Sequence, residues 1–142
     1  MVAVLKPSKK ILNNYKNKEM IKEDYVSFET AKLLKEKGFK SDDCHTAYDE
    51  NGQFFWYGDY SKDRKGAIDA PTLQMAMKWL REKDIIITIV YTRYSLQTIG
   101  LQLMFGFNIQ NAQGKLLFEN IDVAYDSYEQ AEIDAIKYSL EI

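Results

Sequence analysis

The sequence predicts an α+β fold: an antiparallel sheet with helices packed on one face, in the order α-ββ-α-βββ-α after an N-terminal arm. Three observations lead to this prediction. Residues 69–83 carry apolar side chains at the i, i+3, i+4, i+7 spacing of a helix. Residues 101–110 alternate apolar and polar side chains, as strands do. Residues 44–57 hold two short aromatic segments around an Asn-Gly pair, which is typical of a hairpin.

The chain divides into a basic arm, residues 1–24, and a single α+β domain, residues 25–142. Its 142 residues, 46% of them apolar, are enough to bury one core. The arm has weak periodicity and a strong excess of lysine. The only acidic residue among its first 22 is Glu19, and the lysines there are Lys6, Lys9, Lys10, Lys16, Lys18 and Lys22.

The first helix is expected over residues 28–37, with Ser27 as its N-cap and Gly38 just past its end. The hairpin follows, and then a polar loop over residues 58–68. Asp69 is the expected cap of the next helix, and Pro71 suits its first turn. Met75 and Trp79 widen the apolar stripe of this helix, so elements should cover it on more than one side.

Residues 85–91 form a continuous β-branched run, which predicts a strand covered on both faces. Residues 101–110 and 115–119 are the next two strands, joined by a turn at residues 111–114. The last helix is expected to begin at Asp126 or Ser127 and to be apolar on two opposite sides. One side should meet the sheet. The other should meet the helix of residues 69–83, the arm or a second subunit.

Composition favours a soluble protein of the cytoplasm. The net charge of −2 draws the chain neither to nucleic acid nor to acidic membranes. Cys44 is the only cysteine, so no internal disulfide can form. The apolar start is too short for a signal peptide, and the longest apolar run is too short to span a bilayer.

No motif of a known reaction is present, and we expect no catalytic residue, metal site or cofactor. Cys44 and His45 are neighbours on a predicted strand, so their side chains point to opposite faces and cannot act as a pair. The paired acids fall at turns and helix caps, where local geometry accounts for them. A small enzyme without a recognisable motif stays an open alternative.

Three segments together resemble a group of small uncharacterised proteins encoded by Bacteroidetes genomes and their phages. These segments are Tyr25-Val-Ser-Phe-Glu-Thr-Ala-Lys-Leu-Leu-Lys-Glu-Lys-Gly38, Ala70-Pro-Thr-Leu-Gln-Met-Ala-Met-Lys-Trp-Leu-Arg-Glu82, and Tyr125-Asp-Ser-Tyr-Glu-Gln-Ala-Glu132 continuing into Ala135-Ile-Lys-Tyr138. The arm departs from that pattern. The resemblance implies a phage or mobile-element setting, in the host cytoplasm, and carries no activity.

Binding to protein is the function we expect, as a homo-oligomer or within a larger assembly: an accessory role in anti-defence, regulation or the virion. Tyr and Trp favour such interfaces. The residues expected to face a partner are Trp56, Tyr57, Met75, Trp79, Ile133, Ile136 and Leu140.

Nucleic-acid binding is the alternative, through the arm and a Tyr/Arg surface. The residues expected to serve it are Lys9, Lys10, Lys16, Arg64, Lys65, Arg93 and Tyr94. From residue 69 onward the order α-β-β-β-α is that of double-stranded-RNA-binding domains. Those domains need lysines at the start of the last helix, where this chain has Asp126, Glu129 and Glu132.

Overall fold

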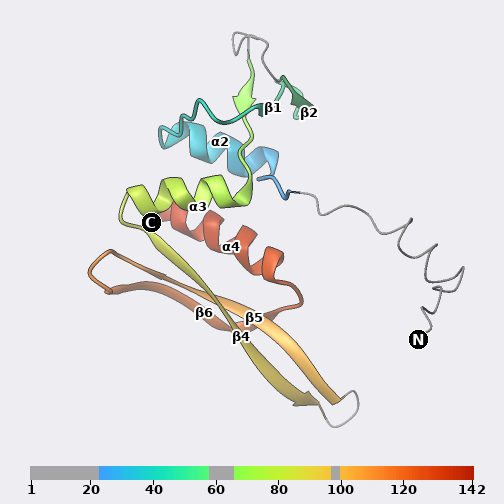
Figure 1. The fold of residues 1–142 in the computed structure, drawn as a ribbon, viewed down its shortest axis with the longest axis vertical. Coiled ribbons are helices and arrows are strands. Elements are labelled where there is room, and N and C mark those ends of the chain that lie inside the picture. The colour runs from blue at the N-terminus through green and yellow to red at the C-terminus, as the bar shows by residue number, and fades with distance from the viewer. Residues whose placement is uncertain (1–22, 58–65, 97–99) are drawn as a thin grey trace, which may run out of the picture.

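A computed structural model describes residues 23–57, 66–96 and 100–142, and it confirms the α+β class (Figure 1). Within these ranges lie three helices and two three-stranded antiparallel sheets. The helices are α2 (Phe28–Glu36), α3 (Leu73–Glu82) and α4 (Tyr128–Glu141). The larger sheet contains β4 (Ile86–Leu96), β5 (Gly100–Gln110) and β6 (Leu116–Tyr125), in that order. In the smaller sheet, β1 (Thr46–Tyr48) lies between β2 (Phe54–Trp56) and β3 (Ile68–Asp69).

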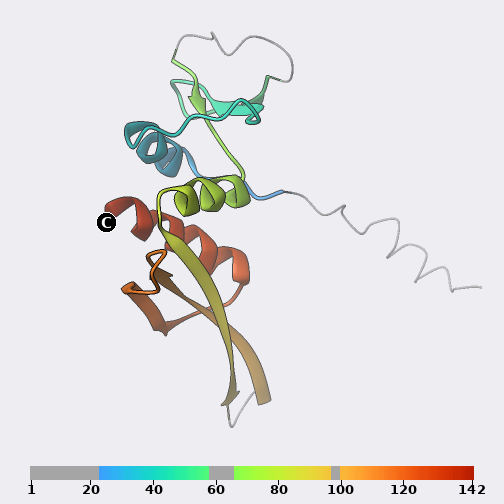
Figure 2. The same ribbon diagram turned by 60° about the vertical axis from the view of Figure 1, so that its left-hand side comes forward.

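Helix α4 is the middle layer of the molecule. It contacts all three strands of the larger sheet on one side and both α3 and α2 on the other (Figures 1 and 2). The two apolar sides of its sequence therefore have separate partners within the chain. Of the three partners considered for the side turned from the sheet, the structure shows the helix of residues 69–83, which is α3.

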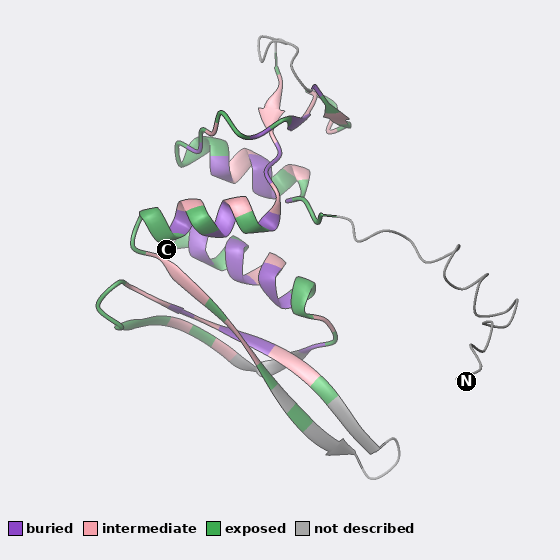
Figure 3. Ribbon diagram, viewed as in Figure 1, coloured by how far each residue is buried: buried purple, intermediate pink, exposed green. Residues whose placement is uncertain are grey.

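Two hydrophobic clusters hold these layers together (Figure 3). One lies among the helices, where Leu34 and Leu80 meet Ile136 of α4. The other lies between α4 and the sheet, around Phe107 and Ile109 of β5. Because α4 contributes side chains to both clusters, it joins the helical part of the core to the part against the sheet. Fully burying a side chain of this size stabilises the fold by about 1.5–3 kcal/mol.

The helix ends follow side-chain chemistry closely, with one correction. Ser27 caps α2 and Ser127 caps α4, as predicted, each accepting a hydrogen bond from a backbone N–H three residues on. Helix α3, however, is capped by Thr72, whose Oγ1 accepts from the Met75 N–H at 3.1 Å. Asp69 is instead part of β3 and pairs with Ala47 of β1. The sequence pattern had no signal for a strand of two residues.

Strand β4 differs from its prediction: it is not covered on both faces. Ile87 and Ile89 pack toward α4, opposite Ile109 and Phe107 of β5. On the other face Thr88 is exposed. A β-branched run fits a half-buried pleated surface as well as a fully buried one, so composition could not distinguish the two.

Candidate functional site

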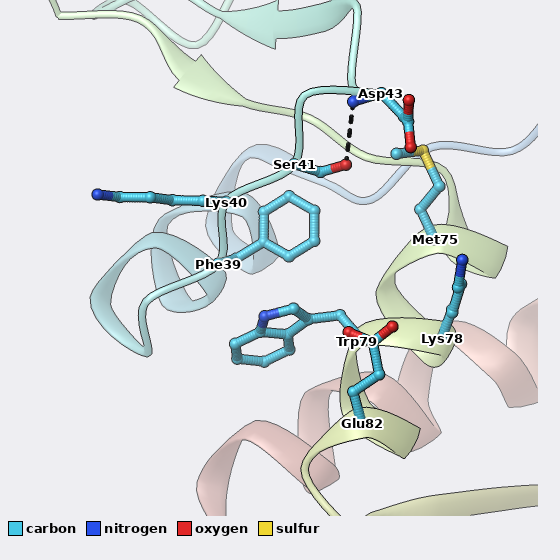
Figure 4. A pocket seen from close by; sticks show the side chains of 8 residues that line it. All are labelled: Phe39, Lys40, Ser41, Asp43, Met75, Lys78, Trp79 and Glu82. Carbon is cyan, nitrogen blue, oxygen red and sulfur yellow. Dashed lines mark hydrogen bonds between the residues drawn. The ribbon is translucent and has the colours of Figure 1, made fainter.

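A shallow pocket of about 270 Å³ lies between α3 and the segment that follows α2 (Figure 4). Trp79 lies next to Phe39 in the lining; their ring centroids are 5.7 Å apart and the ring planes are inclined at 68°. Met75 lies at the other end, beside Asp43. Both Met75 and Trp79 were expected to face a partner. The structure leaves them half-buried, covered in part by residues 39–43.

The chemistry around this pocket is mixed. Lys40 and Lys78 contribute positive charge, and Asp43 and Glu82 contribute negative charge. The ammonium group of Lys83 lies 4.8 Å from the centre of the Trp79 ring, a cation–π distance. Among the residues that the structure describes, no group of three or more His, Cys, Asp or Glu is placed to hold a metal ion. The pocket therefore presents an aromatic surface bordered by two positive and two negative side chains.

The hairpin separates its two predicted interface residues. Trp56 is 74% exposed, and its neighbour Tyr57 is buried. The Tyr57 hydroxyl donates to the carbonyl oxygen of Cys44 and lies 3.2 Å from Asp69 Oδ1. Burial is the main reason that the pKa of Tyr57 is raised, with Asp69 adding to it. Tyr57 thus links the segment before β1 to Asp69 of β3, and its side chain is buried within the described part of the chain.

On α4 the structure also corrects the predicted surface. Ile136 and Leu140 are buried in the cluster shared with α2 and α3, and Ile133 packs against that cluster. Their spacing correctly indicated a second apolar side. Ile136 and Leu140 are therefore covered within one chain, while Ile133 stays half-buried.

The sequence pattern did not predict the environment of Glu132, which was noted only as one of three acids near the start of the last helix. Glu132 is buried and accepts a hydrogen bond from Gln74 Nε2 at 3.2 Å. Burial raises its pKa, and the negative charges of Glu129 and Asp24 raise it further. The signal was available, because Glu132 precedes Ile136 and Leu140 by four and eight residues and so shares their ridge.

Beyond the N-terminal end of α4, strands β4 and β5 continue as a two-stranded ribbon. Pairing with β6 reaches Phe105 of β5, whose ring meets Tyr128 at the start of α4. From there residues 92–96 of β4 pair only with residues 100–104 of β5 among the described strands (Figure 1). On the helix-facing side Tyr91 is 69% exposed and Leu103 43% exposed. We refer to residues 92–96 and 100–104 as the ribbon.

The two edges of the larger sheet are built differently. Strand β4 pairs with β5 without interruption from Ile86 to Leu96, and its only charged residue is Arg93. Strand β6 shows two register shifts against β5 and carries Glu119 and Asp122. Bulges and charges are the devices that protect a sheet edge from further pairing. Edge β6 has both devices. Edge β4 has no register shift and a single charged residue.

The residues expected to bind nucleic acid are brought together only in small part. Arg93 is exposed on β4, and Tyr94 follows it in the same strand. The other five, which are Lys9, Lys10, Lys16, Arg64 and Lys65, lie outside the described residues. Asp126, just before α4, and Glu129, in its first turn, are exposed where a lysine cluster would be needed to bind phosphate.

Among the described helices none is both long and apolar enough to cross a membrane. No family model matches the chain, and no curated protein or solved structure matches it either.

Proposed function

We propose that this protein works by binding another protein chain through the ribbon and the adjoining part of β4. In keeping with the resemblance of its sequence, we place that role in a phage or mobile element acting in the cytoplasm of a bacterial host. Anti-defence, regulatory and virion-associated roles all use binding of this kind. The proposal assigns the protein no catalytic step.

The proposal is carried by two exposed apolar side chains, Tyr91 and Leu103, which lie on the same face of the sheet as the exposed Arg93, opposite Leu103. A two-stranded ribbon is marginally stable in water, and it gains stability when a third strand or a packed surface covers it. Here the helical cover stops at Tyr128, while Tyr91 and Leu103 continue the apolar face beyond it. A protein partner that covers these side chains would complete the layer that α4 begins.

Capture of partners from infected host cells tests the proposal, with the chain itself as bait. The variant Leu103→Lys replaces an apolar side chain on that face of the ribbon by a charge. Leu116→Lys is the matched control, because Leu116 is a similarly exposed leucine of β6 at 48%. We expect a protein retained by the wild type and by Leu116→Lys to be lost with Leu103→Lys. Equal retention by all three chains would exclude the ribbon as the contact.

Nucleic-acid binding is the second candidate, and one observation favours it. Residues 85–118 contain no acidic side chain, and Arg93 is exposed within them. A mobility shift of labelled DNA or RNA that weakens with salt and is lost on deleting residues 1–22 would support it. No shift at low salt would remove it.

A further inference from the structure

We propose that β4 pairs antiparallel with β4 of a second copy of this chain, which joins two three-stranded sheets into one six-stranded sheet. This goes beyond the proposed function, because it concerns the outer edge of β4 and not the covering of the face that carries Leu103. None of the described strands pairs with the outer edge of β4, and its backbone groups form an unbroken row from Ile86 to Leu96.

The composition of β4 makes a second copy the fitting occupant. The strand is rich in β-branched and aromatic residues, lacks Pro and Gly, and holds a single charge. Two such strands can therefore pair without needing an oppositely charged residue on the partner strand. The only like-charge conflict would arise if Arg93 lay opposite its own copy, and most registers avoid that.

One register uses the whole strand. Tyr91 is the midpoint of Ile86–Leu96, so a two-fold axis through Tyr91 pairs the full length of both strands. This register sets Tyr91 opposite Tyr91, a cross-strand aromatic pair, and Arg93 opposite Ile89, which is uncharged. It also places a second tyrosine beside Tyr91, which is 69% exposed.

The other edge explains why pairing would stop at two copies. A β4-to-β6 contact between copies would repeat without closing and give a filament. The register shifts of β6 and its exposed acidic residue Glu119 disfavour a straight partner strand there. Pairing of β4 with β4 uses both open edges at once and leaves only protected ones.

Cysteine cross-linking tests the register directly, because Cys44 is the only natural cysteine and is buried. A residue on the axis lies within about 4.5–5.5 Å of its own copy, Cα to Cα, which a disulfide can bridge. Tyr91→Cys should therefore give a disulfide-linked dimer under mild oxidation. Thr88→Cys, exposed on the same strand, would be paired with Tyr94 and its two copies would lie roughly 20 Å apart. It should stay unlinked, as should Leu117→Cys on β6.

Light scattering of the wild type supplies the second measurement. The expected mass is twice the 16.6 kDa of one chain, reduced to one chain by Tyr91→Lys and left unchanged by Leu117→Lys. A strict monomer at about 100 μM, equal linkage of Thr88→Cys and Tyr91→Cys, or growing filaments would each overturn the dimer. A dimer lost on deleting residues 1–22 would point to the arm as the joining segment and overturn it too. A monomer that still captures a Leu103-dependent partner would remove this inference and leave the proposed function standing.

Discussion

The ends of α2 and α3 provide a test in which the same backbone geometry predicts opposite changes in stability. Each helix ends with a residue of positive φ, Gly38 at 94° and Asp84 at 64°. Each is followed by an apolar residue whose N–H returns to the helix, from Phe39 to Leu34 O at 2.9 Å and from Ile85 to Leu80 O at 3.0 Å. These are Schellman endings, one with the favoured glycine and one without it.

The magnitudes follow from the cost of a Cβ in the left-handed region, about 1–2 kcal/mol. A Cβ on Gly38 would meet no atom within 4 Å, so Gly38→Ala carries the conformational cost alone. We expect a loss of about 1 kcal/mol, after the stiffer unfolded chain offsets part of it. Asp84→Gly relieves the strain and removes a negative charge from the helix C-terminus, so we expect a gain of about 0.5 kcal/mol.

Urea unfolding followed by circular dichroism measures both changes, and the thermal midpoints should shift by roughly 4 °C per kcal/mol in the same directions. Asp84→Asn is the control, because it removes the charge and keeps the side chain. If Asp84→Asn stabilises the fold as much as Asp84→Gly does, the gain comes from removing the charge. If Asp84→Gly destabilises the fold, or Gly38→Ala leaves it unchanged, the two endings do not have the described geometry.

Three further expectations concern buried groups. Burial raises the pKa of Glu132 above its ordinary value of 4.5, so its contribution to the free energy of unfolding should decline as the pH rises from there through the folded pKa. In urea titrations at several pH values, Glu132→Gln should remove that decline. A difference in free energy of unfolding between the wild type and Glu132→Gln that does not change with pH would contradict the prediction. Ile136→Ala should cost about 2–5 kcal/mol in the same assay, while Ile142→Ala, which is 57% exposed, should cost almost nothing. Equal losses would place Ile136 outside the core. Tyr57→Phe should cost about 0.5–1.5 kcal/mol by removing the hydrogen bond to the Cys44 carbonyl, and a neutral result would exclude that bond.

Local sequence was sufficient where the determining interaction is local. Ser27 and Ser127 mark helix starts through bonds to residues three positions on, and Gly52 of the Asn-Gly turn adopts φ 80° as such turns require. The two apolar sides of α4 also predicted its place between layers. The sequence could not assign those sides to one chain or two, because the pattern is the same in either case.

The remaining differences depend on contacts between distant segments. Strand β3 forms because Ile68 and Asp69 pair with β1, about twenty residues earlier in the chain. A strand of two residues has no periodicity from which the sequence could predict it. The candidate interface was predicted from aromatic content, which does not separate Trp56 from Tyr57. The partners of the Tyr57 hydroxyl, the Cys44 carbonyl and Asp69, come from other segments of the chain.

The central position of α4 has a consequence for synthesis on the ribosome. The Gln74–Glu132 bond joins residues 58 positions apart, and both hydrophobic clusters await side chains of the last described helix. Helices and sheet made earlier must therefore remain unfinished, with apolar surface exposed, until α4 emerges. During that interval the open edge of β4 is the segment most prone to pair with a wrong chain, so we expect a nascent chain stalled before residue 128 to be held by chaperones.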